Sequence, residues 1–169
     1  MITAKRPLKI LFLGAMAVGK SSLIQRLTTD TFSSNYKSTL GVALHEMNIQ
    51  TALGLCSLVL WDTDGEAEDS IFASPYVRGA DAAMIVCDLN RPETLDILEG
   101  LADGMEDRLP GRPVLGLINK TDLGRPTEQF VSTVTKACGR CVLTSALSGD
   151  GVANAMTEIV ELCLRRLQE

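Results

Sequence analysis

The chain has 169 residues, a formal net charge of −5 and an apolar content of 46%. This length suits one domain with its own core, so we expect residues 1–169 to form a single domain. The acidic balance gives no basic surface for duplex or single-stranded nucleic acid, which we exclude as a partner. No apolar run approaches the roughly 18 residues that span a bilayer. The first residues lack the apolar segment of a secretion signal, and we therefore expect a cytoplasmic protein.

A phosphate-binding pattern follows the first apolar run of the chain. Residues 8–13 predict a buried strand, and leucines at helical spacing after residue 22 predict a helix. Between them, the stretch from Gly14 to Ser21 matches the pattern G-x-x-x-x-G-K-[ST]. In this pattern backbone N–H groups and the helix N-terminus bind phosphate, Lys20 reaches the outer phosphates and Ser21 ligates magnesium. The alternative is a glycine-rich turn with an incidental lysine, which rarely fixes all four positions.

The remaining chain alternates predicted strands and helices. Residues 30–41 predict a long mobile connection, and residues 66–74 a second mobile loop. Further strands are predicted at 42–50, 55–61, 82–89, 114–118 and 142–143, and helices at 75–78, 91–109, 127–137 and 152–167. This order predicts an α/β fold: a mainly parallel six-stranded sheet with one antiparallel edge strand and helices on both faces.

The five cysteines do not predict a disulfide framework, because their number is odd and no secretion signal precedes them. Cys138 and Cys141 have C-x-x-C spacing, which leaves a redox or metal role as an alternative. The favoured interpretation is that Cys138 ends a helix and Cys141 begins a buried strand. The other three cysteines then fill the core as small apolar residues.

Polar signals follow four of the predicted strands. They are the phosphate loop, Asp62, Asn119 and Ser145, and ligands of such sheets bind outside the carboxyl ends of the strands. We therefore expect one shared site. Asp62 is positioned like the acid that holds magnesium, usually through water, in phosphate-loop enzymes.

Two further residues of this site bear on the choice of nucleotide. Gly65 lets a backbone N–H approach the terminal phosphate. The Asp122 carboxylate can accept two hydrogen bonds from guanine, from N1 and from the exocyclic amine. Adenine lacks that pair of donors, so the residues predict GTP and GDP as ligands together with Mg²⁺.

With these residues the chain resembles the Ras-like small GTPases, most closely their Rab branch, over essentially its whole length. Matching pieces are Gly14 to Ser21, Phe32, Tyr36 to Gly41, Trp61-Asp62-Thr-x-Gly65, Asn119-Lys-x-Asp122 and Thr144-Ser145-Ala146. The resemblance implies the phosphate-loop GTPase fold and a switch that binds and hydrolyses GTP. It also implies that effectors and regulators bind two switch loops, at about 33–42 and 64–78.

The resemblance assigns a role to individual residues. It implies that Phe32 packs against guanine, that Thr39 ligates magnesium in the GTP state, and that the Ala146 N–H meets guanine O6. The implied nucleotide-binding residues are Gly14, Ala17, Val18, Gly19, Lys20, Ser21, Ser22, Phe32, Tyr36, Asn119, Lys120, Asp122, Ser145, Ala146 and Leu147. The implied magnesium ligands are Ser21, Thr39 and Asp62, and the implied catalytic residues are Lys20, Thr39, Gly65 and Glu66.

Several positions depart from the family pattern. Met16 stands where the family has glycine or a small residue, Asp64 replaces a small residue, and Glu66 replaces the glutamine that orients water. These three departures predict slow hydrolysis. Leu147 replaces a lysine and weakens packing around the base. The last residues lack prenylated cysteines, so no membrane anchor is visible: either the protein is soluble, or a tail has been removed.

Two functions follow from this pattern. The first is a GTP-driven switch, in which magnesium and the terminal phosphate hold both loops until hydrolysis releases them. The second is a GTP-bound interaction module that hardly hydrolyses. An ATP-dependent kinase is disfavoured, because Asp122 would face adenine with nothing to bond.

Overall fold

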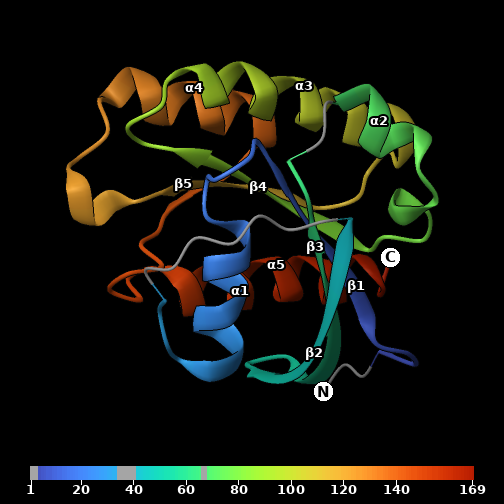
Figure 1. Cartoon of the computed structure of the whole chain (residues 1–169). Coiled ribbons are helices and arrows are strands. Elements are labelled where there is room, and N and C mark those ends of the chain that lie inside the picture. Colours follow the sequence, from blue (N-terminus) through green and yellow to red (C-terminus); the bar gives the residue numbers. More distant parts are fainter. Residues whose placement is uncertain (1–3, 34–40, 66–67) are drawn as a thin grey trace.

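A computed structural model describes residues 4–33, 41–65 and 68–169, and shows a central sheet between two layers of helices (Figure 1). In chain order the elements are β1 (Leu8–Gly14), α1 (Lys20–Thr29), β2 (Val42–Thr51), β3 (Gly54–Thr63), α2 (Glu68–Ala73), the 3₁₀ helix η1 (Pro75–Val77), β4 (Ala82–Asp88), α3 (Glu93–Arg108), β5 (Val114–Asn119), the 3₁₀ helix η2 (Thr121–Leu123), α4 (Glu128–Cys138), β6 (Cys141–Leu143) and α5 (Val152–Arg166).

The six strands lie in the order β2-β3-β1-β4-β5-β6. Strand β2 pairs with β3 in antiparallel register, from Val42 opposite Thr63 to Thr51 opposite Gly54. The other neighbouring pairs are parallel. A hairpin can join only antiparallel strands, whereas each parallel pair needs a crossover through other elements. The predicted mainly parallel sheet with one antiparallel edge strand is confirmed.

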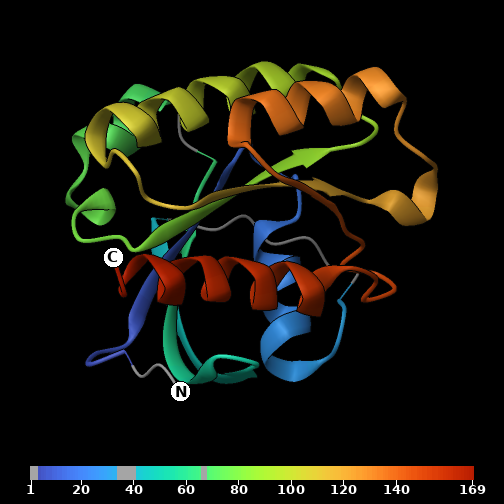
Figure 2. The ribbon, with the colours of Figure 1, turned by 180° about the vertical axis from the view of Figure 1, so that it is seen from behind.

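Side chains of the central strand β1 alternate between two cores. Ile10 and Phe12 are buried with apolar residues of α1 and α5, whereas Leu11 and Leu13 are buried with residues of α2, α3 and α4. Figures 1 and 2 show α1 and α5 on one face of the sheet and the other three helices on the opposite face. Because successive side chains of a strand point to opposite faces, an unbroken apolar run fits a strand covered on both sides. The predicted two-sided cover is therefore confirmed.

The second predicted mobile loop is wrong where the structure describes it. Residues 68–73 form the short helix α2. Ile71 is 2% exposed and belongs to the core beneath α3, and a Cβ on Gly104 of α3 would collide with the ring of Phe72. A helix of six residues shows too little of the 3.6-residue period to be predicted from apolar spacing, and its packing stabilises it.

The parallel strands end at one edge of the sheet, and the loops that follow them carry the predicted site. Strands β1, β3, β5 and β6 end at Gly14, Thr63, Asn119 and Leu143. Of the helices described, none combines the length and apolar character needed to cross a membrane.

Candidate functional site

The loop between β1 and α1 has a backbone that favours small residues. Gly14, Ala17 and Gly19 have φ angles of 145°, 63° and 107°. A Cβ added to Gly19 would collide with the side-chain amide of Asn119, so a larger residue would force that loop apart. Gly19 is also the N-cap of α1, and no side chain of the described residues caps the helix there. The first N–H groups of α1 are thus suited to an anion such as phosphate.

Lys20 places a buried ammonium group beneath this loop. Its side chain donates to the carbonyl oxygens of Gly14 at 2.7 Å and Ala15 at 2.9 Å, and the residue is 6% exposed. Burial lowers the pKa of Lys20 to about 8, although the nearby carboxylates of Asp62 and Asp64 act to raise it. A bound phosphate would add negative charge beside the ammonium and raise this pKa again.

We expect the affinity for GDP to depend on pH through Lys20. Bound phosphate raises the pKa of Lys20, so affinity should be constant below about pH 8, the pKa in the free protein. Above that value affinity should fall by up to about tenfold per pH unit, because binding then requires uptake of a proton. Lys20→Arg is the matched control, since its guanidinium stays charged and should lack this dependence. GDP titrations from pH 7 to 9 measure both, and equal pH profiles would contradict the assignment.

Two of the predicted magnesium ligands, Ser21 and Asp62, lie in contact. Ser21 of α1 donates to the Asp62 carboxylate at the end of β3, with an oxygen–oxygen distance of 2.5 Å. Asp62 is 3% exposed. A hydroxyl and a carboxylate are the hard oxygen ligands that Mg²⁺ prefers, and such sites usually take their remaining ligands from phosphates and water. Ser21 and Asp62 therefore fit Mg²⁺, whereas the third predicted ligand, Thr39, lies outside the described residues.

Asn119 joins the phosphate loop to the loop after β6. Its side-chain nitrogen donates to the carbonyl of Val18 at 3.0 Å. Its side-chain oxygen accepts from the Thr144 hydroxyl at 3.2 Å and from the Ala146 N–H at 3.3 Å. Asn119 is 1% exposed, so each of these bonds is shielded from water. One side chain thus fixes the spacing between two loops that are more than 100 residues apart in the sequence.

The side chains of Lys120 and Asp122 are also held by contacts with residues of other loops. Lys120 donates to the Ala17 carbonyl at 3.0 Å and forms a 2.8 Å ion pair with buried Asp88. The exposed Asp122 carboxylate accepts from the Ser145 hydroxyl at 2.7 Å. The buried residue Ser145 therefore orients the Asp122 carboxylate, which we expect to accept hydrogen bonds from the base.

Gly65 and Asp64 lie between the phosphate loop and the start of β2. A Cβ on Gly65 would collide with the backbone of Met16, so Gly65 packs directly on the phosphate loop. The Asp64 carboxylate accepts from the Gly41 N–H at 3.0 Å, and the Asp64 N–H donates to the Gly41 carbonyl at 3.0 Å. This reciprocal pair joins the near ends of the two expected switch loops.

The structure does not place every predicted site residue. Tyr36, Thr39 and Glu66 lie outside the described residues. Phe32 and Leu147 are 38% and 51% exposed. The remaining predicted residues lie on the phosphate loop, on the first turn of α1, at the end of β3 or on the two loops after β5 and β6.

Three residues of this network were not predicted from the sequence. Asp88 pairs with Lys120 as described above. Arg91 donates to the Met16 carbonyl at 2.7 Å, and Arg26 of α1 donates to the carbonyls of Ala146 and Leu147. The two arginines donate to backbone carbonyls of distant loops, and no local sequence pattern indicates such partners.

The C-x-x-C pair occupies structural positions. Cys138 ends α4 and Cys141 begins β6 as expected, but Cys141 is half-buried because β6 is the short edge strand. Burial raises the pKa of Cys138 to about 12 and that of Cys141 to about 11, which opposes thiolate chemistry at neutral pH. No group of three or more His, Cys, Asp or Glu residues suited to a metal occurs within residues 4–33, 41–65 and 68–169. The favoured packing role therefore fits better than a redox or metal role.

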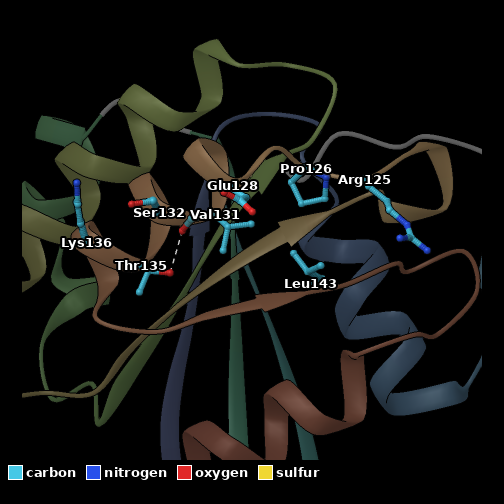
Figure 3. A pocket seen from close by; sticks show the side chains of 8 residues that line it. All are labelled: Arg125, Pro126, Glu128, Val131, Ser132, Thr135, Lys136 and Leu143. Carbon is cyan, nitrogen blue, oxygen red and sulfur yellow. Dashed lines mark hydrogen bonds between the residues drawn. The ribbon is translucent and has the colours of Figure 1, made fainter.

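A groove of about 830 Å³ lies between α4 and the edge strand β6 (Figure 3). Its described lining is Arg125, Pro126, Glu128, Val131, Ser132, Thr135, Lys136 and Leu143, which includes none of the predicted site residues.

Comparison with known proteins gives one consistent family. Residues 9–165 match the Ras family. The chain is 41% identical over 123 residues to the Ras-related protein Rab-34 of Homo sapiens, covering 71% of this chain and 47% of that protein. It is 32% identical over 157 residues to the Ras-related protein RABA1h of Arabidopsis thaliana, covering 90% of this chain and 72% of that protein. The chain thus spans about half the length of Rab-34. The chain belongs to the Ras family of small GTPases, in its Rab branch.

Proposed function

We propose that this chain is a guanine-nucleotide switch that binds GTP or GDP with Mg²⁺ and hydrolyses GTP slowly. The observation that carries the proposal is the bridge made by Asn119. Asn119 joins Val18 of the phosphate loop to Ala146 of the loop between β6 and α5, which we call the base loop. This bridge fixes the distance between the expected phosphate-binding and base-binding residues. Mg²⁺, held through Ser21 and Asp62, would neutralise charge on the phosphate oxygens.

The orientation of Asp122 supports guanine as the base. Ser145 donates to one of its carboxylate oxygens, and a carboxylate has enough lone pairs to accept further hydrogen bonds. The edge of guanine with N1–H and the exocyclic amine offers two adjacent donors. Adenine offers no such pair of donors, so this carboxylate would gain no pair of hydrogen bonds from it.

Chromatography of the nucleotide released from the purified protein tests the proposal. We expect GDP or GTP in near-equal molar amount to the protein. Adenine nucleotide in that position would contradict both the switch and the GTP-bound module.

Asp122→Asn should change the preferred base. An amide donates where the carboxylate accepted, and the 2-oxo group of xanthine can accept from it, whereas the guanine amine cannot. We expect affinity for GDP to fall by at least about tenfold and affinity for XDP to rise, which corresponds to roughly 1.4 kcal/mol or more. Competition between GDP and XDP measures the change. Glu128→Gln, which removes an exposed carboxylate at the start of α4, is the control and should leave the preference unchanged. Unaltered GDP preference in the Asp122 variant would remove this residue from the site.

Slow hydrolysis is supported by the position of Asp64. Its carboxylate accepts a hydrogen bond from the Gly41 N–H. It also lies close enough to Lys20 to act to raise the pKa of that lysine. We assign catalysis to Lys20, Thr39, Gly65 and Glu66, with Asp64 as the group that opposes it. The same Asp64–Gly41 pair favours the second candidate, a GTP-bound interaction module, because it joins the described ends of both switch loops through bonds within the chain.

We further propose that residues 1–169 act as one cytoplasmic domain and that protein effectors and regulators bind residues 33–42 and 64–78. This assignment rests on the described ends of the two segments: the Asp64 carboxylate accepts from the Gly41 N–H, and Gly65 packs on Met16 of the phosphate loop, where nucleotide state would alter them. The net charge of −5 disfavours nucleic acid as a partner.

A further inference from the structure

Arg26 is directed into the protein rather than into solvent. It lies in the last turn of α1, and its side chain is only 16% exposed. A surface helix normally leaves an arginine head group in water. The guanidinium of Arg26 instead reaches the loop between β6 and α5, which carries the residues expected to meet the base.

Besides the carbonyl and the carboxylate of Asp30, at 3.0 and 3.4 Å, this guanidinium contacts two consecutive backbone carbonyls of the loop. Its Nε donates to the carbonyl of Ala146 at 2.9 Å, and its Nη2 donates to that of Leu147 at 2.6 Å. The planar fork of an arginine presents several N–H groups in fixed directions, so two such bonds define the orientation of both peptide groups. A lysine ammonium could not impose this geometry.

The orientation of these peptides decides where their N–H groups point. The carbonyl of Ala146 and the N–H of Leu147 belong to one trans peptide and point in opposite directions. Holding the carbonyl toward α1 therefore turns the Leu147 N–H away from α1. The Ala146 N–H already donates to Asn119 on the other side of the loop. Arg26 thus directs the Leu147 N–H away from α1, while Asn119 holds the Ala146 N–H.

Leu147 makes this support more important in this chain. Its side chain is 51% exposed. It stands where the family pattern has a lysine. The stem of Arg26 runs close to the same loop, because a Cβ added to Gly149 would lie 3.5 Å from its Cδ. The loop is therefore fixed from the α1 side, by Arg26.

We infer that Arg26 is a positioning residue for guanine: it holds the loop of residues 145–149 so that backbone N–H groups meet the 6-oxo group of the base. This inference rests on the proposed function, because it specifies how the proposed site retains guanine. Arg26 itself contacts neither base nor phosphate through the bonds described.

The test compares GDP with 6-thio-GDP, whose sulfur is a weak acceptor in place of the 6-oxo group. Dissociation constants and rates are measured for wild type, Arg26→Met and Arg26→Lys. Asp30→Gly is the matched control. It removes the carboxylate that Arg26 also contacts, at 3.4 Å, and glycine accepts the φ of 52° at that position. Thermal unfolding without nucleotide shows whether each variant is folded.

We expect Arg26→Met to lower the affinity for GDP by about tenfold and the affinity for 6-thio-GDP by less than about threefold, since only GDP offers the strong acceptor. The affinity of Arg26→Lys for GDP should lie between those of wild type and Arg26→Met, and the affinity of Asp30→Gly should equal that of wild type. If Arg26→Met does not fold, the same comparison in Arg26→Lys decides. Equal losses for both nucleotides, or no loss, would overturn the positioning role. A wild-type protein that binds neither nucleotide would instead overturn the proposed function itself.

Discussion

Asn119→Ala should weaken GDP binding by at least about a hundredfold, roughly 2.7 kcal/mol. The substitution removes the bond to the Val18 carbonyl and both bonds accepted from Thr144 and Ala146. The phosphate loop and the base loop would then lose their common anchor, and binding would have to order both. Several buried bonds are lost together, so unfolding free energy should also fall by about 2 kcal/mol or more.

Urea unfolding and GDP titration measure the two effects of this substitution separately. Asn48→Ala is the matched control, because Asn48 is exposed on β2 and bonds only the Ser57 hydroxyl among the contacts described. It should change neither quantity by more than about 0.5 kcal/mol. If Asn119→Ala binds GDP like wild type, the bridge does not organise the site.

The triple variant Met16→Gly, Asp64→Ala, Glu66→Gln should hydrolyse GTP at least about tenfold faster than wild type, a barrier lower by roughly 1.4 kcal/mol. Asp64 lies near enough to Lys20 to affect its pKa and would compete with the terminal phosphate for that ammonium. Two like charges about 4 Å apart cost on the order of 4 kcal/mol at an effective dielectric near 20. Removing the carboxylate also releases the Gly41 N–H.

The other two substitutions concern the access of an activating protein to the site and the group beside the attacking water. Met16 is 57% exposed on the phosphate loop and adds bulk where an arginine from an activating protein would enter. A glutamine amide at position 66 can donate to the transferring phosphoryl group, whereas a carboxylate only accepts.

Single-turnover hydrolysis is measured for each single variant and for the triple variant. Asp103→Ala, which removes an exposed carboxylate from α3, serves as the control and should leave the rate unchanged. A triple variant no faster than wild type would show that these departures do not limit hydrolysis.

Most of the sheet could be predicted because its strands are buried on both faces. Residues such as Leu11 and Phe12 serve opposite cores, and this produces the unbroken apolar runs that indicate parallel strands. Helix α2 could not be predicted, since a helix of six residues depends on packing at Ile71 rather than on its own periodicity.

The residues of the site also divide into those that the sequence predicts and those that it does not. Residues within motifs, such as Asn119 and Lys120, were predicted because their chemistry fixes their spacing. Arg26 and Arg91 were not, because they donate to backbone carbonyls of distant loops, and any residue type supplies a carbonyl. The turn of Asp64 toward Gly41 likewise depends on a contact between segments that only the fold brings together.

The central claim is that one site recognises guanine nucleotides, and competition binding to the nucleotide-free protein tests it most directly. GDP and ADP are titrated with and without Mg²⁺. The account predicts that GDP binds at least about a thousandfold more tightly than ADP, because Asp122 would face adenine without donors. It also predicts that removing Mg²⁺ speeds nucleotide release. Equal affinity for GDP and ADP would contradict the account.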